Sequence, residues 1–142
     1  MGLTSADGRR LMEGFDLNSQ VPLEKTLKAE LDVEKGTIYL HDFIAKKHLR
    51  APKEATHVNI TGILSKIDFD GGNHELNSKN ICLKLGVKKQ NISLKLDSVK
   101  GKGFHFYLLQ MCFLKEKGEQ LQELKEGNSL TILTVEVPGI RE

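Results

Sequence analysis

The sequence contains no tryptophan, two cysteines and three prolines. Two cysteines without a Cys-x-x-Cys pair cannot build a disulfide framework and give no support to a structural zinc site. No segment approaches the roughly 20 apolar residues that cross a bilayer, so we predict no membrane span. Residues 1–25 also lack the apolar stretch of a signal peptide, and we therefore expect a cytoplasmic protein by default.

Catalytic and cofactor motifs are missing as well. The sequence has no Gly-x-Ser-x-Gly elbow and neither a Walker nor a dinucleotide-binding glycine pattern, so no cofactor is predicted. Five histidines occur, but their spacing matches no metal-ligand motif. Because the net charge is only +2 and lysines are interleaved with acidic residues along the chain, the composition argues against nucleic acid as a partner.

What is present is the composition of a globular domain. With 142 residues, 39% of them hydrophobic and 28% charged, the chain is long enough for one domain with its own core. Its longest apolar run covers 103–115 and reads Gly-Phe-His-Phe-Tyr-Leu-Leu-Gln-Met-Cys-Phe-Leu-Lys. Read with a period of two, both faces of this run are apolar except at His105 and Gln110. The pattern predicts a central strand over 104–114 that is covered on both sides.

Such a strand would be about 36 Å long at about 3.3 Å per residue, which is long for a single strand. We therefore expect a bulge or bend in it and place this bend near Gln110. A buried helix is the alternative interpretation of the run. The aromatic residues, the preceding glycine and the Lys-Glu-Lys-Gly segment that follows favour the strand.

Alternation of apolar and polar residues predicts further strands on either side of this run. They cover 26–33, 37–43, 55–69, 80–85, 92–97 and 129–137. A helix through Leu23, Leu27 and Leu31 fits the first of these equally well. In 55–69 the apolar phase shifts, which predicts a bulge near Ser65 and Lys66. Residues 44–54 are interpreted as a connecting loop.

Seven or eight strands with turn signals every 8–15 residues, and no repeated alternation of strand and helix, predict an all-β fold. We expect an antiparallel immunoglobulin-like β-sandwich, although the Cys-Trp-Cys pattern of true immunoglobulin domains is missing. Residues 1–20 would form a short helix or arm that packs on the sandwich domain of 21–142. The helix, over 3–15, would cover the second face of the central strand; a homodimer partner is the alternative cover.

Two basic segments are the candidate binding sites. They are the loop 44–54 and the turn 86–91, and the candidate contacts to an anion or a partner are Lys46, Lys47, His48, Arg50, Lys88 and Lys89. A solvated loop explains the same residues. The segment 68–75 superficially resembles a calcium loop, but it lacks the glycine position and the distant glutamate of an EF-hand, so we predict a turn and no metal. Cys82 and Cys112 are interpreted as small hydrophobic residues of strands, which could form a bridge only if their strands pair.

Several short segments of the sequence, taken together, form a recognisable set. The most specific of them is Pro-x-x-Ala-Thr-His-Val at 52–58. The others are Pro-Leu at 22–23, Gly-Thr-Ile at 36–38, Asp-Phe-Ile at 42–44, Ile-Asp-Phe at 67–69, Phe-Tyr-Leu-Leu at 106–109 and Asn-Ser-Leu-Thr-Ile at 128–132. Over roughly residues 9–137 this set of segments resembles a family of uncharacterised proteins from Bacteroides-type bacteria. The resemblance implies no activity, because the family has no known one.

Three functions stay open at this point. The leading hypothesis is a non-enzymatic β-sandwich module for protein–protein interaction or a structural role, with an unidentified protein partner. The alternative is a binder of an anionic ligand or nucleic acid that uses the basic residues named above. The third is a hydrolase that uses His57 or His48 with a nearby carboxylate, which a perturbed histidine pKa inside a cleft would reveal.

Overall fold

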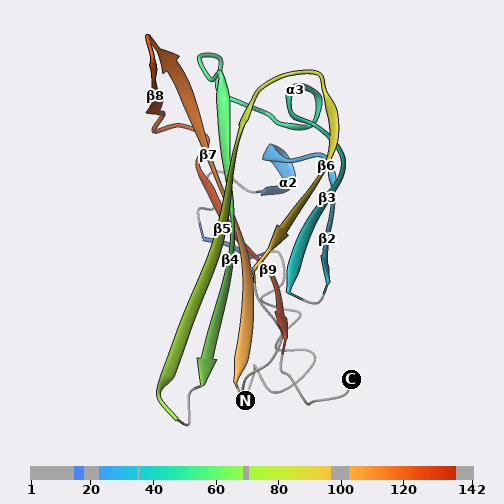
Figure 1. Ribbon diagram of the computed structural model, residues 1–142, viewed down its shortest axis with the longest axis vertical. Helices are drawn as coiled ribbons and strands as arrows, with labels where there is room; N and C mark the ends of the chain where they lie inside the picture. The colour runs from blue at the N-terminus through green and yellow to red at the C-terminus, as the bar shows by residue number, and fades with distance from the viewer. Residues whose placement is uncertain (1–14, 18–22, 35, 69–70, 97–102, 137–142) are drawn as a thin grey trace.

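The described part of the chain folds into two antiparallel β-sheets packed face to face (Figure 1). The structure is a computed structural model, and it describes residues 15–17, 23–34, 36–68, 71–96 and 103–136. The predicted all-β sandwich is confirmed. The predicted helix over 3–15 falls outside the described residues, apart from residue 15.

The larger sheet has six strands in the order β1-β9-β7-β4-β5, with β8 pairing on β7. Its strands are β1 (Phe15–Asp16), β4 (His57–Asp68), β5 (Asn73–Lys84), β7 (Phe104–Lys117), β8 (Gln120–Glu123) and β9 (Ser129–Glu136). The smaller sheet has three strands in the order β2-β3-β6. They are β2 (Glu30–Glu34), β3 (Thr37–Ile44) and β6 (Lys89–Lys95).

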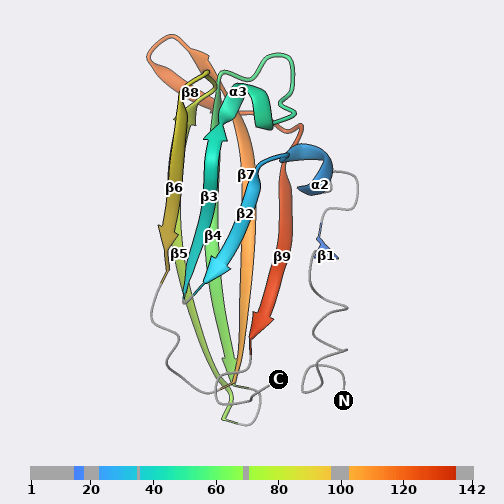
Figure 2. The same cartoon turned by 90° about the vertical axis from the view of Figure 1, so that its right-hand side faces the viewer.

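Two single helical turns, α2 (Leu23–Thr26) and α3 (Ala45–His48), lie at one end of the sandwich (Figures 1 and 2). The sequence left helix and strand open for 23–33, and the structure contains both in succession, because α2 precedes β2. The loop predicted for 44–54 was wrong at its start, where α3 forms. Within the described residues, no helix has the length and apolar character that a membrane span requires.

The central strand is β7, as predicted. It pairs along one side with β4, from Phe104↔Ile67 to Leu114↔His57, and along the other with β9. The bend predicted near Gln110 was wrong, because Gln110 pairs in regular register with Thr61 and Leu130. The register shift against β9 lies instead between Tyr107 and Leu108.

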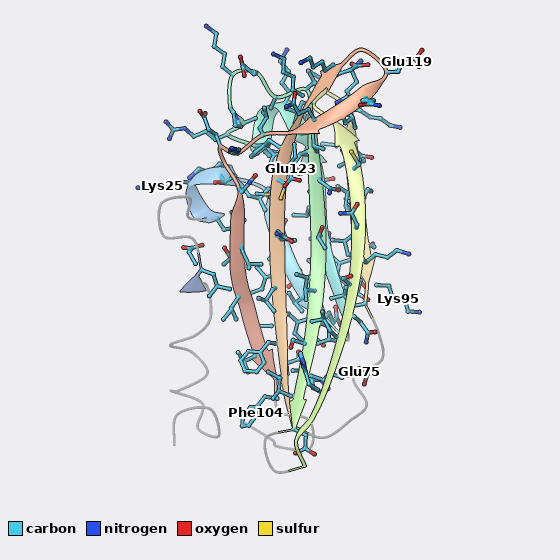
Figure 3. The ribbon with its side chains drawn as sticks, turned by 90° about the vertical axis from the view of Figure 1, so that its left-hand side faces the viewer. Lys25, Glu75, Lys95, Phe104, Glu119 and Glu123 are labelled. Atoms are coloured by element: carbon cyan, nitrogen blue, oxygen red, sulfur yellow. The ribbon has the colours of Figure 1, made fainter. Side chains whose placement is uncertain are left out.

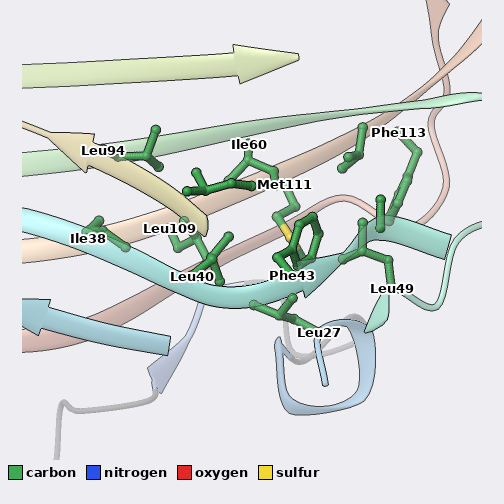
Figure 4. Close-up of a cluster of buried hydrophobic side chains, with 13 residues drawn as sticks. Leu27, Ile38, Leu40, Phe43, Leu49, Ile60, Leu94, Leu109, Met111 and Phe113 are labelled. Carbon is green, nitrogen blue, oxygen red and sulfur yellow. The ribbon is translucent and has the colours of Figure 1, made fainter. Parts of the chain in front are cut away.

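The main core fills the space between the two sheets (Figure 4). The inward side chains of β7 and β4 pack against those of β3, β6, α2 and α3; the fully or nearly fully buried ones include Ile38, Leu40, Phe43, Val58, Ile60, Leu94, Leu109, Met111 and Phe113. Gly62 is buried on the same face and lets the sheets approach, because a Cβ built there would lie 3.0 Å from Cδ1 of Ile38. Period-two alternation in the sequence therefore identified the core correctly.

The outer face of the larger sheet carries a second apolar cluster (Figure 3). Phe106, Ile132 and Val135 are buried there, and Ile67, Phe104 and Leu108 pack against them in partly buried positions. This cluster shelters the outer face of β7 around Phe106, whereas Gln110, Cys112 and Leu114 on that face are only partly buried. The prediction that both faces are covered for most of the strand therefore holds fully for the inner face and only in part for the outer one.

Strand β4 runs without interruption past residues 65 and 66, so the bulge predicted near Ser65 and Lys66 was wrong. Its register with both β5 and β7 is continuous over the whole strand. The apolar phase changes because Lys66 occupies an inward position, where it is 7% exposed, while Ile67 joins the outer cluster.

A bulge does interrupt β3. Its register against β6 shifts between Leu40 and Phe43, and Asp42 has a φ of 49°, a left-handed conformation that few non-glycine residues adopt. The Asp42 amide donates to Oδ1 of Asn91 at 2.8 Å. The extra residue returns Phe43 to the inward face, where it is fully buried.

Candidate binding surfaces

The predicted basic residues gather around α3, at the end of the sandwich where β3 ends and β6 begins. Ile44, the last residue of β3, pairs with Lys89, and the amide of Lys46 donates to the carbonyl of Gly86 at 2.9 Å. These two contacts bring the segments 44–48 and 86–89 side by side. Arg50 lies toward α2 instead, since its amide donates to the Thr26 carbonyl at 2.8 Å.

We call this end of the sandwich the basic end, and its charges are exposed to solvent. Lys46, Lys47, Arg50, Lys88 and Lys89 all have exposed side chains. None of the five forms an ion pair with a described residue; the pairs recorded are His41–Asp32 and Lys115–Glu54, each at 3.9 Å. Within the described part of the chain, the basic end therefore presents positive charges that no ion pair neutralises.

His48 serves the fold of this end. Its Nδ1 accepts a hydrogen bond from the amide of Ile44 at 2.9 Å, which requires that nitrogen to be unprotonated. Its ring also packs against Phe43, with the ring centroids 6.1 Å apart. We therefore assign His48 a structural role in α3 and do not count it among the exposed cationic residues.

His57, the other histidine considered for a hydrolase, lies on the outer face of β4. Its Nδ1 is 2.9 Å from Oγ1 of Thr56, and this hydroxyl also accepts from the amide of Glu116 at 2.7 Å. These contacts tie the start of β4 to β7. Among the described residues, no group of three or more His, Cys, Asp or Glu side chains is arranged to hold a metal ion.

The two cysteines are free thiols. Both are register partners of Asn59, Cys82 on β5 and Cys112 on β7, so β4 lies between them. Two strand spacings of roughly 4.8 Å exceed the Cα separation of about 7 Å that a disulfide tolerates. Burial, then the charge and hydrogen bond of Glu123, raise the pKa of the Cys112 thiol, which keeps it protonated and poorly nucleophilic.

Among the described residues, no strand pairs with β2 on its side toward β9, so no hydrogen-bonded strand joins the two sheets on this side of the sandwich, which we call its open side (Figure 2). A groove of about 380 Å³ lies there, between the edge strand β2 of the smaller sheet and strands β1 and β9 of the larger sheet, next to α2. It is lined by Asp16, Leu23, Leu27, Ala29, Leu31, Thr131 and Leu133. On the opposite side, residues 85–88 connect β5 of the larger sheet to β6 of the smaller sheet at the end of the sandwich that carries α3 (Figure 1).

Asp16 fixes the shape of this groove. Its Oδ1 accepts from the hydroxyl of Thr131 at 2.6 Å and from the amide of Leu23 at 3.0 Å. One carboxylate therefore joins β1, β9 and the start of α2, and it satisfies a backbone donor that the first turn of a helix leaves unpaired. Five of the seven residues that line the groove are leucine or alanine, and Asp16 and Thr131 add polar groups to its wall.

A row of polar side chains crosses the inner face of the larger sheet at its other end. Register pairs place Glu136, His105, Lys66 and Glu75 side by side on β9, β7, β4 and β5. His105 is 0% exposed, and neither ring nitrogen has a hydrogen-bond partner among the described residues. Burial, then the charge of Lys66, lowers the pKa of His105 below 6.5, while Glu75 acts in the opposite direction, so the ring is neutral near pH 7.

Tyr107 adjoins this row and is also fully buried. Its hydroxyl donates to Oε2 of Glu136 at 3.3 Å and makes a backbone hydrogen bond with Gly36, at the turn between β2 and β3. Burial and the charge of Glu136 raise the pKa of Tyr107 far above 10.0. The phenol therefore stays protonated and links the two sheets.

Neither the groove nor the polar row was anticipated from the sequence. Both depend on which strands become neighbours, whereas local alternation reports only which way a side chain points. The lysine that breaks the apolar pattern of β4 was the one available signal for the polar row. A scan against models of protein families and searches of curated proteins and of solved structures found no match to this chain.

Proposed function

We propose that this chain is a non-enzymatic β-sandwich module that binds another protein at its open side. The observation that carries the proposal is the groove of about 380 Å³ between β2 and β9, which is lined mainly by leucine and alanine. A mainly apolar groove at an unpaired sheet edge is the kind of surface that proteins use to receive an extended segment of a partner. The protonated Cys112 thiol and the structural contacts of His48 and His57 also favour binding over catalysis.

Blocking the groove tests this function. Ala29 lines the groove, and Ala29→Arg would place a long cationic side chain in it. Leu76→Arg is the matched control, because Leu76 is 61% exposed on β5, away from the groove. In cells of the source organism, chemical cross-linking should capture protein partners with the unaltered chain and with Leu76→Arg. With Ala29→Arg those partners should be lost while the circular dichroism spectrum is retained.

The opposite results are informative. If the same partners cross-link to Ala29→Arg, binding occurs elsewhere and the groove is not the site. If the unaltered chain cross-links to no protein, the module does not act by protein binding.

A second function, the binding of an anionic ligand or nucleic acid, is favoured by the exposed cations of the basic end, which form no ion pair with a described residue. Lys47→Glu with Lys89→Glu reverses two of these charges. Lys79→Glu with Lys95→Glu makes the same net change on exposed lysines of β5 and β6 and serves as the control. Fluorescence anisotropy with a single-stranded oligonucleotide, measured over a salt series, should show salt-dependent binding that only the first pair abolishes. Equal losses from both pairs would indicate non-specific charge attraction.

A homodimer through the outer face of the larger sheet stays a prediction. The partly buried side chains of Ile67, Phe104 and Leu108 on that face support it. Light scattering on the full chain should give twice the monomer mass if it forms. A monomer mass at all concentrations would remove this arrangement.

A further inference from the structure

The edge of the smaller sheet beside the groove is the five-residue strand β2. Among the described residues it pairs only with β3, from Glu30↔His41 to Glu34↔Thr37. Its other edge faces the open side of the sandwich, toward β9 (Figure 2). An unpaired edge carries a row of free backbone donors and acceptors, which an added strand can satisfy.

The groove accommodates alternate side chains of such a strand. In an extended chain, side chains that point the same way are about 6.6 Å apart, and those in between point to the opposite face. A strand added beside β2 would direct one set inward, next to Leu31, Ala29 and Leu133, which line the groove. The inward set should therefore be mainly apolar, because five of the seven lining residues are Leu or Ala and the Asp16 carboxylate is already bonded to Thr131 and Leu23.

The outward set would lie beside a row of carboxylates. Every second residue of β2 is acidic and exposed, namely Glu30, Asp32 and Glu34. Asp32 lies 3.9 Å from Nε2 of His41, whereas Glu30 and Glu34 form no ion pair with a described residue. Opposite charges on neighbouring strands stabilise a sheet and like charges destabilise it. The outward set must therefore be basic.

The same charges argue against a second copy of β2 as the occupant. An antiparallel pair of β2 strands centred on Asp32 would place Asp32 opposite its equivalent and Glu30 opposite the equivalent of Glu34. Every outward pair would then join two carboxylates, which is unfavourable. The acidic row thus protects the edge from self-association and leaves it free for a strand of the opposite charge.

We infer that the free edge of β2 and the adjoining groove bind an extended segment of another protein in which apolar residues alternate with lysine or arginine. This inference rests on the proposed protein-binding function and names the chemistry of the partner. The bound segment becomes a fourth strand of the smaller sheet and closes the open side of the sandwich.

A synthetic peptide tests the inference directly. The probe is a fluorescein-labelled heptapeptide in which lysine alternates with valine. One control peptide has the same composition with the valines contiguous, and a second has glutamate in place of lysine. The third control is a pair of alternating peptides, one N-methylated at its odd-numbered residues and the other at its even-numbered residues. Fluorescence anisotropy should detect binding of the alternating lysine peptide alone, because the controls remove the alternation, the charge and the backbone donors respectively.

Charge variants of the protein assign the site. Glu30→Lys with Glu34→Lys should weaken binding of the lysine peptide at least about tenfold and should allow the glutamate peptide to bind, as expected when charges across an interface are exchanged. Glu116→Lys with Glu119→Lys makes the same net change on exposed positions of the β7–β8 hairpin and should leave binding unchanged. Amide hydrogen exchange should slow in residues 30–34 when the peptide is bound.

Each contrary result has its own meaning. Equal weakening by both variant pairs, or binding of the contiguous or N-methylated peptides, would overturn strand addition at β2. If no peptide binds while Ala29→Arg still abolishes cross-linking in cells, this inference fails and the proposed function survives. If light scattering shows self-association that Glu30→Lys with Glu34→Lys abolishes, the occupant is a second copy of this chain and the inference is wrong.

Discussion

Replacing Gly62 with valine tests how closely the two sheets pack. A Cβ at position 62 would lie 3.0 Å from Cδ1 of Ile38 and 3.3 Å from Cδ1 of Leu94. Carbon atoms pack best at about 3.5–4.0 Å, so even a methyl group is crowded and the two further carbons of valine overlap these neighbours. Overpacking of this kind costs about 1–3 kcal/mol of unfolding free energy.

A double-mutant cycle isolates the steric part of this cost, because the strand propensity of valine cancels in it. Ile38→Val removes the closest methyl group and by itself costs about 0.5–1.5 kcal/mol. Together with Gly62→Val it should cost less than the sum of the two single changes, with a coupling of about 0.5–3 kcal/mol. Urea unfolding followed by circular dichroism measures all four proteins.

The control for this cycle is Gly86→Ala. The nearest atom to a Cβ there is the Lys84 carbonyl oxygen at 3.9 Å, and Gly86 does not have a positive φ. Alanine should therefore leave stability unchanged or raise it by up to about 1 kcal/mol. A coupling near zero between positions 38 and 62, or a Gly62→Val protein as stable as the unaltered one, would refute the close packing of the sheets at Gly62.

Three further predictions concern titratable groups. Because the pKa of His105 is lowered in the fold, the unfolded chain binds a proton that the folded chain does not; the unfolding free energy should fall as pH drops below 6.5, and by less in His105→Gln. Parallel pH profiles of the two proteins would contradict this. The raised pKa of Tyr107 predicts the reverse at alkaline pH: stability should fall as pH rises above about 10, where the unfolded phenol ionises, and Tyr107→Phe should reduce that fall. Thiol titration should show a fast reaction at exposed Cys82 and a slow one at the partly buried Cys112, and Cys82→Ser should leave only the slow phase. Two equal rates would count against the raised pKa of the Cys112 thiol.

The sequence predicted the features of the fold that depend on local alternation. Residues 104–114 were recognised as the central strand because no polar face interrupts them, and the inward residues of β6, Ile92 and Leu94, are buried as expected. Bulges were placed wrongly. Lys66 was interpreted as a break in β4, although it occupies a regular inward position. The change of apolar phase from Ile38 and Leu40 to Phe43, which accompanies the bulge at Asp42, was not interpreted as a bulge.

The candidate surfaces were likewise predicted from the sequence only in part. The basic residues were visible in the sequence, but their meeting around α3 depends on the pairing of Ile44 with Lys89. The groove depends on the order of strands in two sheets, to which no short segment points. The immunoglobulin-like relationship and the Bacteroides-type resemblance stay predictions.

The bulge in β3 makes the length of that strand more important than the identity of residue 42. Glycine or asparagine would replace Asp42 at the lowest cost, because both adopt a φ of 49° more easily than other residues, and the strain of another side chain would stay at this one residue. Deleting the residue would instead turn Phe43 toward solvent and move the register of Ile44 against β6 by one position. We therefore expect natural variation at this point to consist of substitutions, with insertions and deletions absent. The orientation of the basic end depends on the one extra residue of β3, which has no counterpart in β6.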